Sequence, residues 1–216
     1  MKISHQHARF MKKLLICLDF DGTLFDTGRV IFSFPEIVQW GKGGFSKVLE
    51  EYYEFSKDEF LPEKFSGFLK AEKSFSVESA DRLASRFTEV RERAPELVFE
   101  DALFFINQFP KGMLAILTRA HPDWQEGNIS ASGLRQYFSK VFIVKGKNGK
   151  RDVLEKLSVQ YGHIIFIDDS PKEIDQVLGV KGVKAILLNR QGVIGRVGPK
   201  DLREVLSQVK ELLGFG

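Results

Sequence analysis

Short apolar segments recur along this chain, and stretches with helical periodicity separate them. Each segment has four to six residues, is rich in leucine or β-branched residues and does not alternate with polar residues. Such runs are typical of a parallel sheet, because its strands are buried on both faces. The alternation of strands and helices then predicts a doubly wound, Rossmann-like α/β fold. The segments are Leu14–Leu18, Met113–Thr118, Val141–Val144, Ile164–Ile167 and Lys184–Leu188.

Helical patterns of suitable length follow the later strands. Pro171 fits the first turn of one of these helices, and Gly179 fits its C-terminal cap. The expected helices span residues 123–132, 151–160, 171–179 and 199–213.

The stretch between the first two strands is different, because residues 29–95 contain no comparable strand. Ser46–Phe55 and Ser76–Arg93 have the pattern of amphipathic helices. Many of the 20 phenylalanines lie between residues 32 and 109, which indicates a small unit with an aromatic core. Pro95 marks the return to the sheet domain, where Glu96–Phe109 is expected to be a helix.

We therefore expect two domains. Residues 11–28 and 96–216 form the α/β core, and residues 29–95 form a helical cap inserted after the first strand. Residues 1–10 are expected to be an extension that precedes Met11.

Composition excludes several classes of function. The 216 residues include 32 Lys and Arg against 29 Asp and Glu, and the net charge of +3 is too small to indicate nucleic acid binding. No apolar run approaches the roughly 18 residues that a membrane span requires. The single cysteine, Cys17, lies within the first strand, where core packing is expected, and it is compatible with a reducing cytoplasm.

Two aspartates close the first strand. Asp19 follows five apolar residues, so it is expected at the carboxyl end of a buried strand, which is where open α/β sheets bind ligands. Asp21 points the same way because strand side chains alternate, and Gly22 then turns the chain. Two close carboxylates predict a divalent cation with oxygen ligands.

Other polar residues follow the later strands and are expected at the same edge of the sheet. Together they offer carboxylates for a cation, and a hydroxyl and positive charges for phosphate oxygens, which is the chemistry of phosphoryl transfer. They are Thr118 and Arg119, the lysines Lys145, Lys147 and Lys150, and the acids Asp168, Asp169 and Glu173.

These residues resemble the four motifs of the haloacid dehalogenase-like superfamily. Asp19–Asp26 is similar to the DxDGT[LV] first motif, and Ile116–Thr118 to the hydrophobic second motif that ends in Thr or Ser. Lys150 resembles the lysine of the third motif, and Phe166–Ser170 with Glu173 resembles the acidic fourth motif. The helical insert resembles the cap of the superfamily's helical-cap phosphatases.

The resemblance implies a mechanism. Asp19 would be the nucleophile that becomes an aspartyl-phosphate, and Asp21 would be the general acid and then the general base. The pKa of Asp21 must then be raised from its reference value of about 4. Thr118, Arg119 and Lys150 would bind the phosphoryl group.

The resemblance also implies Mg2+ as the cofactor. Its ligands would be Asp19, the backbone carbonyl of Asp21, and Asp169, and Asp168 and Glu173 would support it. The expected activity is hydrolysis of a small phosphorylated metabolite, with no nucleic acid or membrane partner.

Several alternatives remain open. A phosphomutase of the same fold would pass the phosphoryl group to a second hydroxyl. A phospho-acceptor or binding module without turnover would use a similar set of residues. Dehalogenases of the superfamily lack the second aspartate and use no metal, so Asp21 argues against them. Phosphonate hydrolysis would need a cap lysine such as Lys42 or Lys47, for which a surface position is the simpler interpretation.

Some residues have no settled role. Lys145, Lys147 and Lys150 compete for the catalytic position, and Lys150 is favoured because it opens a helix. Asp26 is expected to cap the linker to the insert. The pair Tyr52-Tyr53 is expected on the surface and in the core of a helix rather than in a specificity site. The substrate and the oligomeric state are not readable from the sequence.

Overall fold

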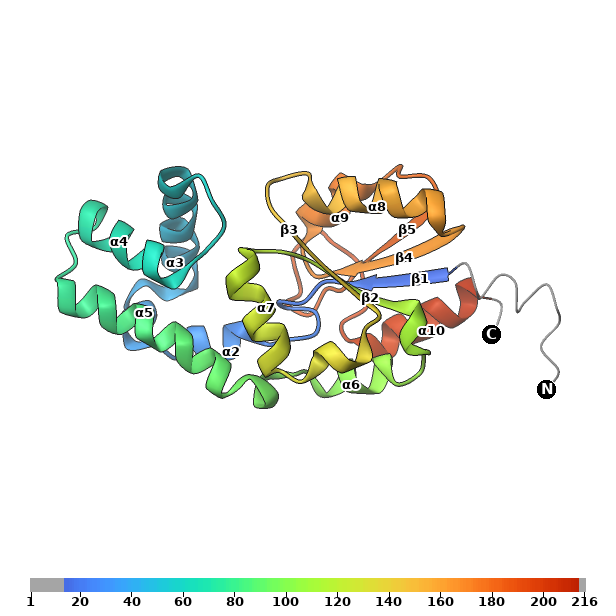
Figure 1. Ribbon diagram of the computed structural model, residues 1–216, viewed down its shortest axis with the longest axis horizontal. Helices are drawn as coiled ribbons and strands as arrows, with labels where there is room; N and C mark the ends of the chain where they lie inside the picture. Colours follow the sequence, from blue (N-terminus) through green and yellow to red (C-terminus); the bar gives the residue numbers. More distant parts are fainter. Residues whose placement is uncertain (1–13, 214–216) are drawn as a thin grey trace.

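The central feature of the fold is a five-stranded sheet in the order β3-β2-β1-β4-β5, in which all neighbours are parallel. The computed structural model describes residues 14–213 (Figure 1). The proposed extension, residues 1–10, lies outside this range. The strands fall on the five predicted segments to within one residue at each end: β1 is Leu14–Leu18, β2 Leu114–Arg119, β3 Lys140–Val144, β4 His163–Asp168 and β5 Val183–Leu187.

Helices cover both faces of the sheet, as expected of a doubly wound fold. Successive residues of β1 point to opposite faces of the sheet and pack in two different hydrophobic clusters. Ile16 packs in the cluster that includes α6 and α10, whereas Cys17 packs in the cluster that includes α8 and α9. Figure 1 shows α8 and α9 on one side of the sheet and α6 and α10 on the other. The helices of this domain are α6 Glu100–Ile106, α7 Pro122–Ala131, α8 Gly149–Gln160, α9 Pro171–Val177 and α10 Leu202–Leu212, with short 3-10 helices η1 Ala94–Leu97, η2 Lys111–Met113 and η3 Leu134–Tyr137.

Three of the predicted helices of the α/β core are shorter than expected, and the one expected over 171–179 ends at Val177. The helix expected over 96–109 is reduced to α6, because Val98 is extended and pairs with Phe25 in an antiparallel bridge. The helix expected from residue 199 begins at Leu202, because the side chain of Asp201 caps its first turn.

A second group of helices lies beyond the carboxyl edge of the sheet (Figure 1). It is made of α2 Thr27–Ile31, α3 Pro35–Ser56, α4 Pro62–Glu72 and α5 Val77–Glu92, and it contributes no strand to the sheet. The helix expected over 46–55 is the second part of α3, which is interrupted at Gly41, where φ is 65°. The proposed domain boundaries, after residue 28 and after residue 95, fall within α2 and within η1.

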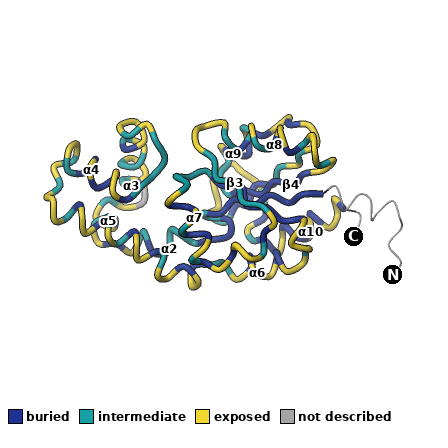
Figure 2. The backbone as a smooth tube through the Cα atoms, viewed as in Figure 1, coloured by how far each residue is buried: buried dark blue, intermediate teal, exposed yellow. Residues whose placement is uncertain are grey.

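Aromatic rings form the interior of this helical group, as the phenylalanine content predicts. Tyr52 and Phe65 are fully buried, with ring centroids 5.4 Å apart, and Phe68 and Phe87 pack around them. Figure 2 shows the central strands as buried and the edge strand β3 as intermediate, whereas the cap helices alternate between buried and exposed positions. The aromatic interior of the cap is continuous with the core on the α6 and α10 side of the sheet.

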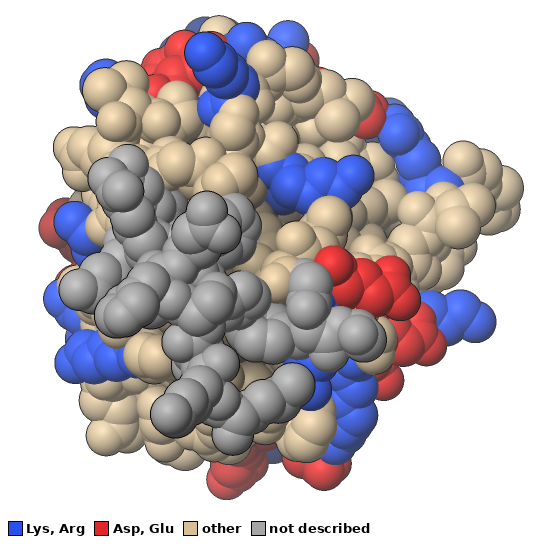
Figure 3. All heavy atoms as spheres, turned by 90° about the vertical axis from the view of Figure 1, so that its right-hand side faces the viewer, with Lys and Arg blue, Asp and Glu red and all other residues tan. Residues whose placement is uncertain are grey.

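The surface at the amino end of the sheet carries charges of both signs, scattered among uncharged residues (Figure 3). This distribution agrees with the small net charge of +3. Within residues 14–213, no helix combines the length and the apolar character that crossing a bilayer demands.

Candidate active site

The two central strands bring three carboxylates together. Leu18 of β1 pairs with Ile167 of β4, so the residues that follow in each strand lie side by side. Asp19, Asp168 and Asp169 each direct one carboxylate oxygen to the same place, and these three oxygens lie within 4.8 Å of one another. The predicted convergence of the first and fourth motifs at one sheet edge is therefore present in the structure.

Lys150 completes this cluster from the first turn of α8. Its Nζ donates to Asp19 Oδ1 at 2.6 Å and to Asp168 Oδ2 at 2.7 Å, and its side chain is only 4% exposed. By contrast, Lys145 pairs with Asp58, and Lys147 is exposed. Of the three competing lysines, Lys150 is thus the one beside Asp19. We call Asp19, Lys150, Asp168 and Asp169 the acidic floor.

Burial shifts the acid–base behaviour of the acidic floor. Burial, reinforced by the charge of Asp19, raises the pKa of Asp168 to about 8 and that of Asp169 to about 7. Burial alone would lower the pKa of Lys150, but the charges of Asp19 and Asp168 outweigh it and raise that pKa. Three carboxylates share a single ammonium here, so a further positive charge would be favourable.

The donor set fits Mg2+, which prefers carboxylate oxygens. Both oxygens of Asp168 are engaged, since Oδ2 accepts from Lys150 and Oδ1 accepts from the Ser170 N–H at 2.8 Å. Asp19 and Asp169 are therefore better placed to be direct ligands, and Asp168 to hold Lys150.

Gly22 allows the first-motif loop to approach Asp169. Its φ is +76°, a region that favours glycine, and a Cβ atom at this position would lie 2.3 Å from Asp169 Oδ2. The glycine of the first motif is thus required twice, by its backbone conformation and by the space that Asp169 occupies.

Asp21 lies at the edge of the acidic floor and is held by two side chains. Thr27 donates to Asp21 Oδ1, and Gln125 Nε2 donates to Asp21 Oδ2 at 2.6 Å. Burial raises the pKa of Asp21, and the charge of Asp19 adds to this, while the hydrogen bonds from Thr27 and Gln125 oppose it. The raised pKa is the direction that a general acid requires.

Sequence reasoning missed Gln125. It lies on α7, is 1% exposed, and its Nε2 also donates to Thr118 Oγ1 at 3.1 Å, so one amide connects the second-motif threonine to Asp21. The only available signal was a glutamine one helical turn after Pro122, in a helix with little amphipathic pattern.

Arg119, the proposed phosphate ligand, makes contacts with carboxylates instead. Its Nη1 lies 2.8 Å from Glu173 Oε1, and its Nε lies 4.0 Å from Glu59 Oε1. Glu173, which was expected to support the metal, is 3% exposed and pairs with Arg119.

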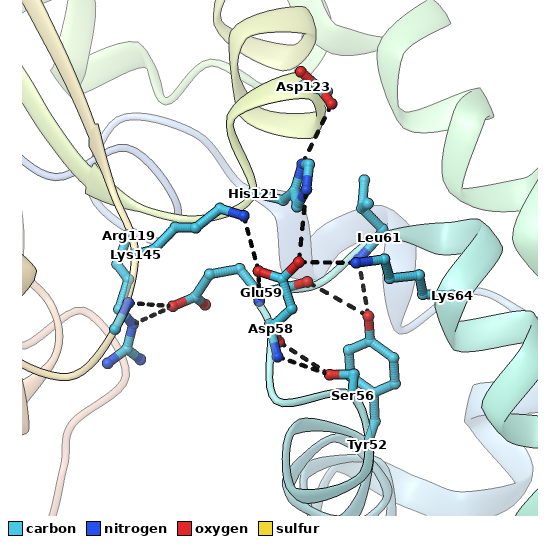
Figure 4. A network of polar contacts seen from close by, with 11 residues as sticks. Tyr52, Ser56, Asp58, Glu59, Leu61, Lys64, Arg119, His121, Asp123 and Lys145 are labelled. Carbon is cyan, nitrogen blue, oxygen red and sulfur yellow. Dashed lines mark hydrogen bonds and ion pairs between the residues drawn. The ribbon is translucent and has the colours of Figure 1, made fainter.

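The loop between α3 and α4 connects the cap to the core (Figure 4). Asp58 accepts from Lys145 at 2.9 Å and lies 3.8 Å from His121, and Glu59 accepts from the Gly146 N–H at 3.0 Å. Hydrogen bonds from Lys64 and Lys145 lower the pKa of Asp58. We call the contacts of Asp58 and Glu59 with the core the seam.

A cavity of about 300 Å³ lies between cap and core, with Asp21 in its wall. Tyr53, which was expected on the surface or in the core of its helix, also lines it, while Tyr52 is fully buried. Asp26, as expected, caps α2 by accepting from the Arg29 N–H at 3.1 Å.

Comparison with known proteins identifies the family. The family model of haloacid dehalogenase-like hydrolases matches residues 14–175. This match spans the first strand, the helical insert and the acidic fourth motif. The chain therefore belongs to the haloacid dehalogenase-like hydrolases and is an enzyme of that superfamily. A search of curated proteins found no match.

Solved structures share the fold at low sequence identity. YfnB from Bacillus subtilis, described as an HAD-hydrolase bound to magnesium, is 18% identical with a TM-score of 0.63, over 94% of this chain and 99% of the other. A family hydrolase from Xanthomonas campestris is 13% identical with a TM-score of 0.67, over 93% and 92%. The L-2-haloacid dehalogenase of Xanthobacter autotrophicus, with chloropropionic acid covalently bound, is 18% identical with a TM-score of 0.54, over 92% and 87%.

Proposed function

We propose that this hydrolase is a Mg2+-dependent phosphomonoesterase that works through an aspartyl-phosphate on Asp19. The observation that carries the proposal is the position of Asp21, whose carboxyl group has a raised pKa and lies beside the acidic floor. A nucleophilic carboxylate next to a second carboxyl group that can carry a proton is the arrangement that hydrolysis of an alkyl phosphate requires.

In the first step, an oxygen of Asp19 attacks phosphorus and the bond from phosphorus to the ester oxygen breaks. Asp21 gives its proton to that oxygen, so the leaving group departs as a neutral alcohol. Lys150, 2.6 Å from Asp19, offsets negative charge on the nucleophile and on the incoming phosphoryl group.

In the second step, water attacks the phosphorus of the aspartyl-phosphate and the bond to Asp19 breaks. Asp21, now a carboxylate, takes a proton from this water, and inorganic phosphate is released. Gln125 holds Asp21 and Thr118 in fixed positions, and the Thr118 hydroxyl would hydrogen-bond a phosphoryl oxygen.

Asp19 and Asp169 would hold Mg2+, with the backbone carbonyl of Asp21 as the proposed third protein ligand. When bound, the ion would supply positive charge to the clustered carboxylates and to the phosphoryl oxygens. We further propose that residues 29–95 act as a cap that excludes water from the site and positions the alcohol. A small phosphorylated metabolite in the cytoplasm, and no nucleic acid or membrane partner, remain part of the proposal.

Dehalogenation is the competing reaction, since solved dehalogenases share the fold. A halide leaves as an anion and needs no proton, so a dehalogenase has no use for an acid such as Asp21. The hydrogen-bonded set of Asp21, Thr27 and Gln125, together with the acidic floor, therefore favours phosphoryl transfer. A phosphomutase would differ in requiring a bisphosphorylated activator.

The test compares the two reactions with one purified protein. Phosphate release from acetyl phosphate and p-nitrophenyl phosphate is measured with Mg2+ and with excess chelator, and chloride release from L-2-chloropropionate is measured in parallel. We expect phosphate release that depends on Mg2+ and no chloride release. Chloride release that is insensitive to chelator, without phosphatase activity, would overturn the proposal.

A further inference from the structure

The cavity above Asp21 has mainly apolar walls. Residues of the cap and of α7 surround a volume of about 300 Å³, which is at the small end for a ligand site. A space of this size suits a single ring better than an extended molecule. The apolar lining consists of Ile31, Phe45, Leu49, Tyr53, Phe60, Phe87, Ala120 and Trp124.

Three of these rings form a continuous surface, which we call the aromatic wall. Phe60, in the loop between α3 and α4, has its ring centroid 4.9 Å from that of Phe87 on α5 and 6.1 Å from that of Trp124 on α7. Arg91 lies over the Trp124 ring, 4.6 Å from its centroid, and also donates to the Trp124 carbonyl. The aromatic wall thus joins the cap to the core, and Arg91 holds its Trp124 ring in place.

Most polar side chains that line the cavity already have partners. Asp21 accepts from Thr27 and Gln125, and the Arg119 Nε lies 4.0 Å from Glu59. Tyr53 brings only its hydroxyl group, and Trp124 brings only its indole N–H. A polyol in this cavity would lose hydration without gaining enough hydrogen bonds, whereas an apolar ring would lose little.

From this surface we infer that the alcohol part of the substrate is a flat, mainly apolar group of about one ring, as in an arylmethyl phosphate. This inference rests on the proposed phosphatase function and deepens it. With the phosphoryl group on the acidic floor, the ester oxygen faces Asp21, and the carbon attached to it continues into the cavity beside the aromatic wall.

The first test uses the unaltered protein with Mg2+ and a matched set of esters. Benzyl, ethyl and glycerol phosphates all have poorly activated leaving groups, so differences between them report binding of the alcohol. We expect kcat/KM for benzyl phosphate to exceed that for the other two by roughly 10- to 100-fold, the gain from burying one ring. Acetyl phosphate serves as the control for the chemical step.

Two results would separate this inference from the proposed function. If glycerol phosphate were hydrolysed as well as benzyl phosphate, the inference would be wrong and the phosphatase function would stand. If none of the esters, acetyl phosphate included, released phosphate, the proposed function would fail and the inference with it.

A second test measures the affinity of the cavity for the ring in the absence of any reaction. Titration calorimetry with Mg2+ present would compare benzylphosphonate with ethylphosphonate, neither of which has an ester bond to cleave. We expect at least a tenfold lower Kd for benzylphosphonate. Equal Kd values would contradict the inference.

A variant then locates the effect in the cavity. Leu49→Trp places a larger side chain in the cavity lining and is expected to lower the ratio of kcat/KM for benzyl phosphate to that for acetyl phosphate at least tenfold. Glu50→Trp, at the next and exposed position of α3, is the matched control and is expected to keep the ratio of the unaltered protein. A ratio that is the same in both variants would overturn the placement of the ring.

Discussion

The acidic floor lies next to Asp21, and the aromatic wall lies across the cavity that Asp21 lines, but the two are built in opposite ways. The floor takes its charged side chains from strand ends and the first turn of a helix, where backbone pairing fixes their positions. The wall takes apolar rings from a loop, a cap helix and α7, which come together only by packing. The floor therefore follows from local sequence motifs, whereas the wall follows from tertiary structure alone.

The two places where ions pair across elements also differ. Lys150 is buried between Asp19 and Asp168, and removing either partner would leave a buried charge. In the seam, Lys145 and Asp58 are 46% and 23% exposed, so water and salt screen their attraction. From this difference we expect a rigid catalytic floor below a cap that can open.

The largest effect on both stability and activity is expected for Lys150→Met. It would leave Asp19 and Asp168 buried without a counter-charge, which costs about 3 kcal/mol or more in unfolding free energy, and activity should fall by roughly 1000-fold. Lys145→Met is the matched control and should change stability little, because that lysine is exposed. Chemical denaturation and acetyl phosphate hydrolysis measure the two effects, and equal losses in both variants would contradict the contrast.

The next effect is the pH dependence of metal binding. The pKa of about 7 for Asp169 means that this proposed ligand must lose a proton to bind Mg2+ near neutral pH. Affinity for Mg2+ should rise by roughly tenfold or more between pH 6 and pH 8. Calorimetry in buffers of different ionisation enthalpy should show proton release on binding, and a pH-independent Kd would contradict the assignment.

The same groups predict how stability depends on pH without metal. Because their folded-state pKa values lie above the unfolded values near 4, their contribution to stability is complete below pH 4 and is lost as pH rises through 7 and 8. The Tm of the metal-free protein should therefore fall over this range, and added Mg2+ should restore it. Thermal scans with chelator and with Mg2+ test this expectation.

A smaller effect is expected for Gln125→Ala. Loss of its hydrogen bond, which lowers the pKa of Asp21, should raise that pKa and move the basic limb of the kcat/KM profile to higher pH. The fall in kcat is expected to be about tenfold, since Thr27 still holds Asp21. Gln136→Ala, at an exposed position, is the control. If kcat fell in Gln125→Ala while the basic limb of the pH profile stayed in place, Gln125 would have a packing role only.

The smallest effect is expected at the seam. Asp58→Asn weakens the contacts with Lys145 and His121, so the cap should close less often. We expect KM for the preferred ester to rise about two- to fivefold with little change in Tm, and added salt should affect the unaltered protein in the same direction. An unchanged KM at low salt would show that the seam does not hold the cap.

Much of the fold could be predicted from the sequence, because buried strands and the residues that end them form local patterns. Asp19, Thr118 and Asp168 end apolar runs and lie where those runs predict. The choice among Lys145, Lys147 and Lys150 needed the structure, because it depends on where α8 starts relative to β1. Gln125 and Phe60 carry no pattern, since their partners are distant in the sequence. The start of α6 depends on the bridge between Val98 and Phe25, and the sequence around Val98 contains no pattern that predicts this bridge.

The most direct test of the central claim is to trap the phosphoenzyme. Asp21→Asn keeps the nucleophile but removes the base that activates water, so with acetyl phosphate and Mg2+ it should accumulate one phosphoryl group, which peptide mass spectrometry should place on Asp19. Asp19→Asn is the control and should carry none, with turnover reduced by roughly 10,000-fold or more. A phosphoryl group on another residue, near-normal turnover of Asp19→Asn, or a 2-propionate ester on Asp19 after incubation with L-2-chloropropionate would contradict the account.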